Sequence, residues 1–501
     1  MSRLPLEKAT ADYVFHELTR SICPECKTVV DAQVLLRGRK VYLRKRCPEH
    51  GVVEALVYGD AEAYVANSRL NKPGSIPLEF ATAVEHGCPH DCGLCPDHQQ
   101  HACVGIIEVN SGCNMDCPLC FANAGPGFSL TLDEVELILD RFVGAEGRPD
   151  VVQFSGGEPT IHPQIMEMVR SAKRRGIPLV MINTNGRRIA YDDDFLAELA
   201  VERPSIYFQF DGFEEETYRA IRGEPGILAE KLRALDRLAE IDLNVVLVPA
   251  IERGINDHEV GRIVRFAIEH PAVRGVNFQP AFHAGRHEAH DPLQRVTIPD
   301  VIGWIEAQTG GLFVRSDFVP IPCCFPTCNS VTYAYLDEAD GTVTPIPRLV
   351  DVEEYLDYIT NRAVPDVAAH ELRSALEGLW ATSALPGADH SIEHLKLSCA
   401  VCDMPPLTDV EISKRFVMIM LQDFMDPWTF NQKNLMKCCK EILLPDGKQI
   451  PFCAYNSVGY REQATAQMAA EQRRRHEAQR EGKAYVSPPL RFDFSRPEAS
   501  R

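Results

Sequence analysis

The sequence lacks a long apolar segment and has a deficit of positive charge. None of its 501 residues lies in an uncharged apolar run of about 18 or more, so no transmembrane helix is expected. The first eleven residues lack the charged and then apolar layout of a secretory signal peptide. The 52 basic residues are outnumbered by 71 acidic ones, which argues against bulk binding to nucleic-acid phosphates. We therefore expect a cytoplasmic globular protein with no nucleic-acid partner.

Cysteine, by contrast, is abundant. Many of the 18 cysteines fall in tight C-x2-C and C-x3-C groups, and without a secretory signal such spacing favours thiolate ligation of metals over disulfides. The length allows several domains. We expect a small metal-binding hairpin domain, a cysteine-rich cluster loop, an α/β domain, a cysteine-rich auxiliary-cluster domain and a charged, mobile tail, at 1–75, 76–104, 105–312, 313–460 and 461–501.

The first candidate metal site consists of two short cysteine motifs flanking a hairpin. Alternating strand patterns at 28–36 and 41–45 surround a turn at Gly38, and their pairing would bring the motifs together. The resulting ligand set is Cys23, Cys26, Cys47 and His50. Three thiolates and one imidazole form a closed tetrahedral set, suited to Zn²⁺ or to a single iron ion. We expect a structural role for this site.

A second cysteine group lies in a loop between Gly87 and Cys103. Its four candidate ligands are Cys88, Cys92, Cys95 and Cys103. They suffice for a complete four-iron cluster held by one loop, and a zinc site is the alternative. Because the cysteines already complete such a set, we expect His98 and His101 to form hydrogen bonds rather than ligate a metal.

From residue 105 onward, strand-like runs alternate with helical patterns. The six runs are 105–110, 150–154, 178–182, 205–210, 244–250 and 275–280. This alternation predicts right-handed crossovers and a parallel sheet. Six units rather than eight predict an open partial (βα)6 barrel, in which ligands bind at the carboxyl ends of the strands.

Unusual residues follow four of these strands. The first strand is followed by Cys113, Cys117 and Cys120, the second by Gly156, Gly157 and Glu158, the third by Asn183 and Asn185, and the fourth by Asp211 and Gly212. Three cysteines can hold a four-iron cluster and leave its fourth iron without a protein ligand. Two adjacent glycines allow the backbone to approach a ligand closely.

This combination resembles the radical S-adenosylmethionine (SAM) superfamily over roughly residues 105–283. The resemblance implies that Cys113, Cys117 and Cys120 hold a [4Fe–4S] cluster whose open iron binds SAM. It implies that the segment Gly156, Gly157 and Glu158 receives the methionine amino group, and that Asn183 and Asn185 contact the ribose or carboxylate. The residue before the last cysteine is usually aromatic in that family. Here Leu119 stands in that place, and it would give apolar contact to adenine.

The resemblance also implies a reaction type. Reductive cleavage of SAM would give methionine and a 5′-deoxyadenosyl radical, which abstracts hydrogen from an unactivated carbon. The electron would come from a reductant such as ferredoxin or flavodoxin. The protein's share of the work is to position the substrate and to exclude water.

The C-terminal part of the sequence is again rich in cysteine. A Pro-Asp-Gly turn at 445–447 between two strand-like runs predicts a hairpin that brings Cys438 and Cys439 across from Cys453. A further auxiliary cluster is therefore expected here. Its candidate ligands are Cys323, Cys324, Cys328, Cys399, Cys402, Cys438, Cys439 and Cys453. They outnumber the four places of one cluster, so some must be ordinary buried thiols.

The segment 416–430 is rich in methionine and aromatic residues. Such a stripe is typical of a buried core. It also fits the wall of an apolar tunnel, because methionine side chains adapt to long, flexible ligands.

Three segments outside the α/β domain support a narrower resemblance. Residues 47–51, 87–103 and 438–456, with the cysteine triplet, are similar to the tetraether lipid synthase group of radical SAM proteins. That group implies further [4Fe–4S] clusters, a mononuclear zinc-ribbon or rubredoxin-like metal, and carbon–carbon coupling of lipid tails. A lipid substrate would require a transient, peripheral contact with a membrane.

Two other functions remain open. One is radical methylation or alkylation of a pterin-like small molecule, which would need a polar pocket instead of a long tunnel. The other is a non-enzymatic iron–sulfur electron carrier. An electron carrier has no use for the open-site triplet and for the Gly156-Gly157-Glu158 segment.

Overall fold

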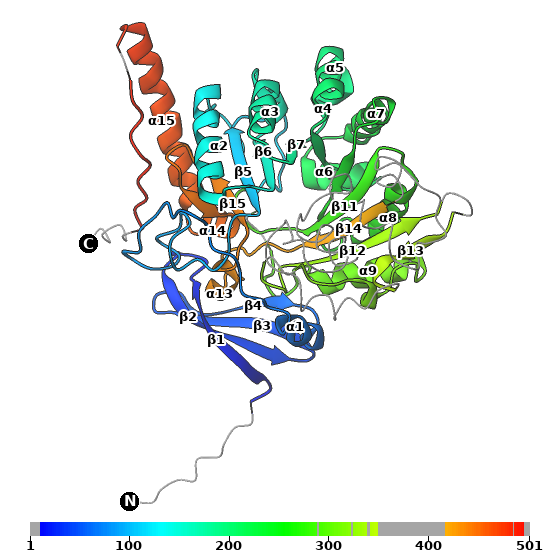
Figure 1. Ribbon diagram of the computed structural model, residues 1–501. Coiled ribbons are helices and arrows are strands. Elements are labelled where there is room, and N and C mark those ends of the chain that lie inside the picture. Colours follow the sequence, from blue (N-terminus) through cyan, green and yellow to red (C-terminus); the bar gives the residue numbers. More distant parts are fainter. Residues whose placement is uncertain are drawn as a thin grey trace, which may run out of the picture.

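The computed structural model describes residues 11–287, 290–321, 324–337, 341–348, 416–483 and 485–494. Within these ranges the chain forms two sheets. Figure 1 shows the small one at the bottom and the large one above it, with helices along the outer side of the large sheet.

The small sheet is N-terminal and antiparallel, in the order β1-β2-β3-β4. Its elements are β1 (Val14–Ile22), β2 (Val29–Arg37), β3 (Lys40–Cys47) and β4 (Gly51–Tyr58), followed by α1 (Ala61–Ser68). The turn between β2 and β3 has positive φ at Gly38 (54°) and Arg39 (65°). Two such residues form the tight turn that matches the twist of a hairpin, so the predicted hairpin is present.

The predicted parallel strands form the centre of the large sheet. They are β5 (Val104–Asn110), β6 (Val151–Gly156), β7 (Leu179–Thr184), β8 (Ser205–Gln209), β9 (Val245–Val248) and β11 (Val273–Pro280). They lie side by side in chain order and pair in parallel. A two-residue strand, β10 (Ala250–Ile251), pairs with β11 beyond the end of β9.

Helices connect these strands. They are α2 (Leu132–Glu146), α3 (Ile165–Arg174), α4 (Arg187–Tyr191), α5 (Asp193–Glu202), α6 (Glu215–Arg222), α7 (Ile227–Glu240), α8 (Val260–Glu269) and α9 (Ile298–Thr309). Short 3-10 helices lie at Pro159–Ile161, Asp257–Glu259, Arg315–Asp317 and Ile346–Arg348. The start of α2 shows how the sequence fixes such helices, because Thr131 and Glu134 form a reciprocal capping box.

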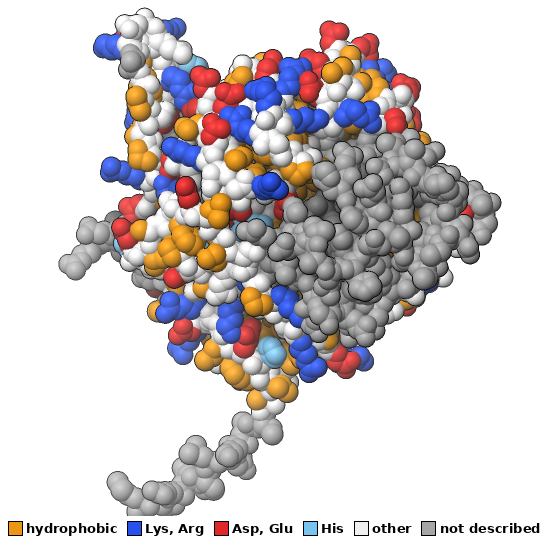
Figure 2. Space-filling view, viewed as in Figure 1, with side chains coloured by type: hydrophobic (Ala, Val, Ile, Leu, Met, Phe, Trp, Pro, Cys, Tyr) orange, Lys and Arg blue, Asp and Glu red, His pale blue; other side chains and the backbone are white. Residues whose placement is uncertain are grey.

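The outer surface of these helices carries both signs of charge. Figure 2 shows Lys and Arg side chains interspersed with Asp and Glu side chains over the described part of this face. Several are paired across neighbouring helices, as Arg170 of α3 is with Glu198 and Glu202 of α5. Exposed pairs of this kind contribute little to stability individually, and they keep the outer face hydrated.

The C-terminal part of the chain extends the large sheet at both edges. Beside β11 lie β14 (Phe416–Gln422), β12 (Asn329–Leu336) and β13 (Val343–Pro345), and beside β5 lie β15 (Lys440–Leu443) and β16 (Gln449–Pro451). β14 pairs in parallel with β11, and β15 in parallel with β5. The segment expected as a separate cysteine-rich domain therefore shares the sheet of the α/β domain. The predicted hairpin is present as β15 and β16.

The expectation of a wholly solvated, mobile tail after residue 460 is wrong for the described residues. After α13 (Gln432–Leu435) and α14 (Phe452–Ser457), the long helix α15 (Tyr460–Arg480) packs its first turns against the sheet. Arg461 is 6% exposed and pairs with the buried Glu108 of β5. Tyr460 accepts a hydrogen bond from the Cys92 amide at 3.0 Å. The charge of this segment misled the prediction, because part of it is buried and paired.

A further structural fact concerns membranes. Among the described residues, no helix combines the length and apolar character needed to cross a bilayer.

Candidate functional site

The cysteine triplet lies in the loop that follows β5. Cys117 is buried, and Cys113 and Cys120 are half-buried. Backbone amides already point at two of the sulfurs, from Met115 to Cys113 and from Ala124 to Cys120, at 3.4 Å each. Burial raises the pKa of Cys113 to about 11. Thiols in such a setting ionise when a cationic group binds them, so the loop fits an iron–sulfur cluster.

Gly156 and Gly157 allow the end of β6 to touch this loop. The Gly157 amide donates to the Asn110 carbonyl at 2.9 Å, and the Glu158 amide donates to the Gly112 carbonyl at 2.8 Å. A Cβ atom on Gly156 would lie 2.1 Å from the Asn110 oxygen, and one on Gly157 would lie 2.1 Å from the Gly112 oxygen. The two glycines are therefore required for backbone contact with the cysteine loop, a role that the sequence had suggested for contact with a ligand.

The Glu158 carboxylate is directed into the protein. It is 1% exposed and accepts hydrogen bonds from Thr160, from the Thr184 hydroxyl at 2.7 Å and from the Asn185 amide at 2.7 Å. Asn185 in turn donates to the Asn114 side chain in the cysteine loop at 2.7 Å. Glu158 thus fixes the end of β7 against the loop, and its role toward SAM stays a prediction.

Arg222 is a cationic neighbour of the triplet that sequence reasoning missed. Its guanidinium donates two hydrogen bonds of 2.7 Å to the buried carboxylate of Asp211. Burial raises the pKa of Cys117, and the nearby Arg222 acts in the opposite direction. Asp211 was noted at its strand end, but its partner is eleven residues away on α6, so only the fold connects them.

A cavity of about 200 Å³ lies inside the curve of the large sheet. Leu119 and Phe121 of the cysteine loop form part of its wall, as does Asn183. Its polar lining combines charged and hydroxyl-bearing residues with six amide side chains from five parallel strands: Gln153, Asn183, Gln209, Asn277, Gln279 and Gln422. The cavity thus lies beside the cysteine loop, and its wall combines apolar side chains with these amides.

Two of the amides, those of Asn277 and Gln279, are held in place by Tyr207. Its hydroxyl accepts hydrogen bonds from Asn277 and, at 2.9 Å, from Gln279. Burial raises the pKa of Tyr207 to about 12, so the phenol stays neutral. The other amide atom of Asn277, its Oδ1, is buried without a hydrogen-bond partner among the described residues. A buried hydrogen-bond acceptor without a partner at a cavity wall indicates where a donor group of a ligand could bind.

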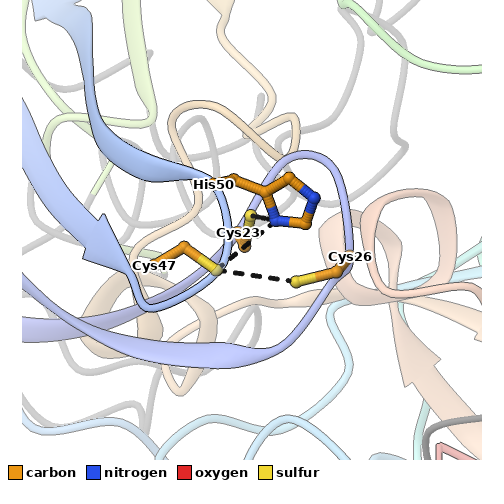
Figure 3. A group of neighbouring side chains, drawn as sticks. All are labelled: Cys23, Cys26, Cys47 and His50. Carbon is orange, nitrogen blue, oxygen red and sulfur yellow. Dashed lines mark hydrogen bonds between the residues drawn. The ribbon is translucent and has the colours of Figure 1, made fainter. Parts of the chain in front are cut away.

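The N-terminal site is brought together as predicted. Figure 3 shows the side chains of Cys23, Cys26, Cys47 and His50 converging from the two ends of the hairpin. The Cys26 and Cys47 sulfurs are 3.7 Å apart, and the His50 Nδ1 atom lies 3.6 Å from Cys23 and 3.5 Å from Cys47. Ligands of a tetrahedral zinc are separated by about 3.5–3.8 Å, so this group fits one metal ion.

The second cysteine loop is also compact. Cys88, Cys92 and Cys95 line one small pocket. The chain just before Cys88 is fixed by three backbone amides that donate hydrogen bonds to the Asp91 carboxylate. Cys103 lies instead beside His101, with its sulfur 3.4 Å from Nε2. Three of the four predicted ligands thus lie together, and ligation by Cys103 remains a prediction. The two histidines form hydrogen bonds, as expected: His98 with the Cys438 carbonyl and His101 with Glu146.

The C-terminal cysteines meet at another pocket. Its wall includes Cys324, Cys328, Cys438, Cys439 and Cys453. The predicted proximity of Cys438 and Cys439 to Cys453 is therefore present. Cys323, Cys399 and Cys402 lie outside the described residues. The five described cysteines can supply a full ligand set for one cluster.

The methionine-rich stripe is both core and cavity wall. β14 is buried along its whole length and pairs with β11 and β12. Within it Met418 and Met420 face the cavity, followed by Phe424. The same wall contains Gln422, so the stripe does not form an exclusively apolar channel.

A group of histidines and carboxylates was missed by sequence reasoning. Glu252, His283 and His287 bring their ligand atoms within 4.8 Å of one another, and His283 also lies near His290 and Asp426. The spacing of His283, His287 and His290 was a signal in the sequence. Glu252 and Asp426 are remote along the chain, so the group becomes visible only in the fold.

Comparisons with known proteins agree with this geometry. The family model described as radical SAM superfamily matches residues 107–267, and that described as HMPTM N-terminal zinc ribbon domain matches residues 15–59. The chain is 33% identical to 7,8-dihydro-6-hydroxymethylpterin dimethyltransferase of Methanocaldococcus jannaschii over 481 residues, covering 89% of this chain and 94% of that protein.

Other similarities are partial. The GTP 3′,8-cyclase of Chlorobaculum tepidum is 32% identical over 214 residues, which is 41% of this chain and 63% of that protein. Among solved structures, SuiB of Streptococcus suis is similar with a TM-score of 0.34 and 14% identity, over 42% of this chain and 46% of that one.

The site and the sheet thus define a radical SAM protein with an α/β fold and an N-terminal zinc ribbon. Membership of this superfamily implies a [4Fe–4S] cluster and SAM, and the ribbon and the cysteine pockets fit additional metal. Within the superfamily, the chain belongs to the family that includes the methanogen protein named above.

Proposed function

We propose that this protein is a radical SAM enzyme that methylates or otherwise alkylates a pterin-like heterocycle. The observation that carries the proposal is the set of six amide side chains lining the cavity next to the cysteine triplet. A pterin ring presents alternating donors and acceptors along one edge, and amides can pair with both. The M. jannaschii relative, a 7,8-dihydro-6-hydroxymethylpterin dimethyltransferase by name, supports the same class of substrate.

Energetics favour a polar substrate over a hydrocarbon tail in this part of the cavity. A tail would leave any amide atom that has no protein partner unsatisfied, and each buried unsatisfied polar group costs about 1–3 kcal/mol. The buried Asn277 Oδ1, which has no partner within the described chain, is one such group. A ring N–H or an amino group would satisfy it.

The residues near the triplet receive roles consistent with this reaction. In this proposal Cys113, Cys117 and Cys120 hold the cluster, and the segment Gly156–Glu158 with Asn183 and Asn185 shapes the SAM site at the edge of a partial barrel. When bound, the cluster and SAM would supply a 5′-deoxyadenosyl radical that removes hydrogen from carbon, and because the methionine released keeps its methyl group, a second SAM would supply the methyl group that is transferred. Arg222 places a positive charge beside Cys117, and Leu119 and Phe121 exclude water from that side of the cavity.

The coupling of lipid tails is a second candidate, supported by a different part of the same cavity. Phe121, Phe282, Phe424 and Phe452 form a cluster of ring contacts with centroids 4.4 to 6.1 Å apart. Phe424 and Phe452 also line the pocket of the C-terminal cysteines. This aromatic cluster borders both pockets and is the feature against which a hydrocarbon chain would lie.

One experiment separates the two candidates. The anaerobically reconstituted enzyme is given SAM and a low-potential reductant, with either 7,8-dihydro-6-hydroxymethylpterin or membrane lipids, and products are analysed by mass spectrometry. A pterin product heavier by methyl or other alkyl groups, with pterin-dependent formation of 5′-deoxyadenosine, supports the first. Lipids lighter by two hydrogens per new bond support the second and contradict the first.

A matched pair of variants links the result to the cavity. Gln279→Leu removes one amide from the cavity wall, and Phe424→Leu trims the aromatic cluster. For a pterin substrate, Gln279→Leu should raise KM by about tenfold, in line with the loss of one hydrogen bond to a buried polar group. Phe424→Leu should change it less, and the reverse order would favour the lipid.

A further inference from the structure

Beside the cysteine loop, three histidines, His283, His287 and His290, lie close to two carboxylates. The His287 Nε2 atom lies 3.3 Å from Glu252 Oε2, and the His283 Nε2 atom lies 3.9 Å from the same oxygen. His283 is 5% exposed, and its Nε2 atom has no hydrogen-bond partner within the described part of the chain. The His283 nitrogen faces the Glu252 oxygen at a distance too long for a hydrogen bond. A cation or a proton between the two atoms would satisfy both of them.

The opposite nitrogen of His283 is already fixed. Its Nδ1 atom is 3.2 Å from Asp426 Oδ2. The other Asp426 oxygen accepts from the Trp428 amide at 2.9 Å, and from the Thr429 amide and hydroxyl at 2.9 Å each. Asp426 therefore holds the Nδ1–H tautomer of His283 and leaves the Nε2 lone pair free. This is the arrangement by which a carboxylate orients a histidine ligand of a metal.

We propose that Glu252, His283 and His287 form a mononuclear site for a divalent first-row metal ion, with Asp426 orienting His283. Two histidines and one carboxylate on one side of an ion are a recurrent set for Fe²⁺, Mn²⁺ or Zn²⁺ and leave positions open. Glu252 and His287 line the central cavity. The open positions therefore face the substrate space, where an oxygen or nitrogen atom of a substrate can complete the coordination.

A third histidine packs against this group. His290 stacks on His283 with centroids 3.6 Å apart, so the His283 ring is held at its face as well as through its Nδ1 atom.

The site is coupled to the cysteine loop by the backbone. The amide of Arg286 donates to the Cys120 carbonyl at 3.0 Å. Gly285 has φ of 65°, and a Cβ there would lie 2.4 Å from the Cys120 and Phe121 oxygens. A metal bound by His283 and His287 would thus sit next to the loop that carries the triplet. The inference rests on this geometry alone and does not depend on which substrate is used.

The test uses Mn²⁺, which prefers nitrogen and oxygen ligands to thiolates and so leaves the cysteine sites undisturbed. Holoenzyme with its clusters oxidised is titrated with Mn²⁺ and followed by electron paramagnetic resonance. We expect one tightly bound Mn²⁺ per chain. Pulsed measurements should show coupling to histidine nitrogen, a readout that needs no variant. Absence of stoichiometric binding, or of nitrogen coupling, would overturn the proposal.

Variants then assign the ligands. His287→Gln and Glu252→Gln should each weaken binding by at least tenfold, and Asp426→Asn by about 10–100-fold. His290→Gln should retain the ion. The matched control is His258→Gln, in a more exposed group with Glu214 and Glu259. Iron and zinc content report that each variant is folded. Equal binding by all variants, or loss in His290→Gln alone, contradicts the assignment.

Discussion

The ribbon site and the cysteine triplet use the same kind of ligand, but they differ in whether a coordination position is left open for another molecule. In the ribbon, three cysteines and His50 surround one point, with ligand atoms 3.5 to 3.7 Å apart. In the triplet, three cysteines lie on one loop, and the end of the next strand, β6, approaches that loop through two glycines. A closed set of four ligands leaves no position for a substrate and serves structure. An incomplete set beside a cavity serves chemistry.

The two sites also differ in how far along the chain their partners lie. The ribbon ligands fall within 28 residues, and the hairpin itself brings them together. The triplet depends on Glu158, Asn185 and Arg222, which belong to different crossover units. The structural effects of mutations in the ribbon should therefore stay local. Those of mutations around the triplet should extend through the large sheet.

The largest effect is expected from Cys117→Ala. Loss of this sulfur removes one of the three ligands of the cluster, so formation of 5′-deoxyadenosine from SAM should be abolished. Zinc in the ribbon and iron bound by the other cysteine pockets should remain. Liquid chromatography of the reaction and metal analysis of the same sample test both statements. Retained 5′-deoxyadenosine would contradict the assignment.

The converse substitution is Cys47→Ala in the ribbon. Structural zinc supplies about 10 kcal/mol of folding free energy in isolated zinc-finger peptides, so the variant should lose its zinc. Residues 14–58 should then become sensitive to protease. Cleavage of SAM should continue, because the triplet lies in the other sheet. If SAM cleavage were lost together with zinc, the separation of roles between the two sites would be wrong.

A smaller effect is expected from Gly157→Ala. The new Cβ would lie 2.1 Å from the Gly112 oxygen, and forcing backbone apart costs about 1–3 kcal/mol. We expect slower SAM cleavage and a lower urea midpoint. The control is Gly144→Ala in α2, where nothing lies within 4 Å of the added atom and the helix should gain about 0.5–1 kcal/mol. Equal behaviour of the two variants would contradict the close approach.

The smallest effect concerns a buried lysine that ties the ribbon to the rest of the chain. Lys45 donates to the Pro427 and Trp428 carbonyls at 2.7 and 2.9 Å. Burial lowers its pKa from 10.5 to about 7. Between these values the unfolded state holds a proton that the folded state lacks. The free energy of unfolding therefore rises with pH across this window, by at most about 1.4 kcal/mol per pH unit for one group, and not below pH 7.

Lys45→Met should remove this pH dependence. The measurement is the urea midpoint for unfolding of the ribbon at pH 7.5 and 9.5, in wild type and variant. If the change of the urea midpoint with pH were the same in the variant as in the wild type, another group would be responsible for it. Arg44→Met, in the same strand with its side chain partly exposed, serves as the control and should leave the slope as it is.

Local patterns predicted much of the fold and of the metal chemistry. The ribbon hairpin follows from Gly38 and the alternation on either side of it. The six parallel strands follow from the repeated change between strand and helix patterns. The C-terminal hairpin follows from its Pro-Asp-Gly turn. In each case the information lies within a few residues, because hydrogen bonding and turn geometry act over that range.

Other features could not be predicted from such patterns. The charge of α15 indicated solvent, but Arg461 is buried against Glu108, more than 350 residues away along the chain. β14 and β15 were expected in a separate domain, yet they complete opposite edges of the central sheet. Burial and pairing of this kind depend on contacts between distant segments, which local propensity does not encode.

The sequence by itself indicated which residues could ligate metal and predicted that one cysteine set is open, because ligand type and spacing are local properties of the chain. Only the tertiary structure decided what surrounds the open set. It brought amides of five strands to one cavity, Arg222 to Cys117, and Glu252 and Asp426 to His283. The physical reason is that parallel strands place their carboxyl ends at one edge of a sheet, so residues far apart in sequence meet there.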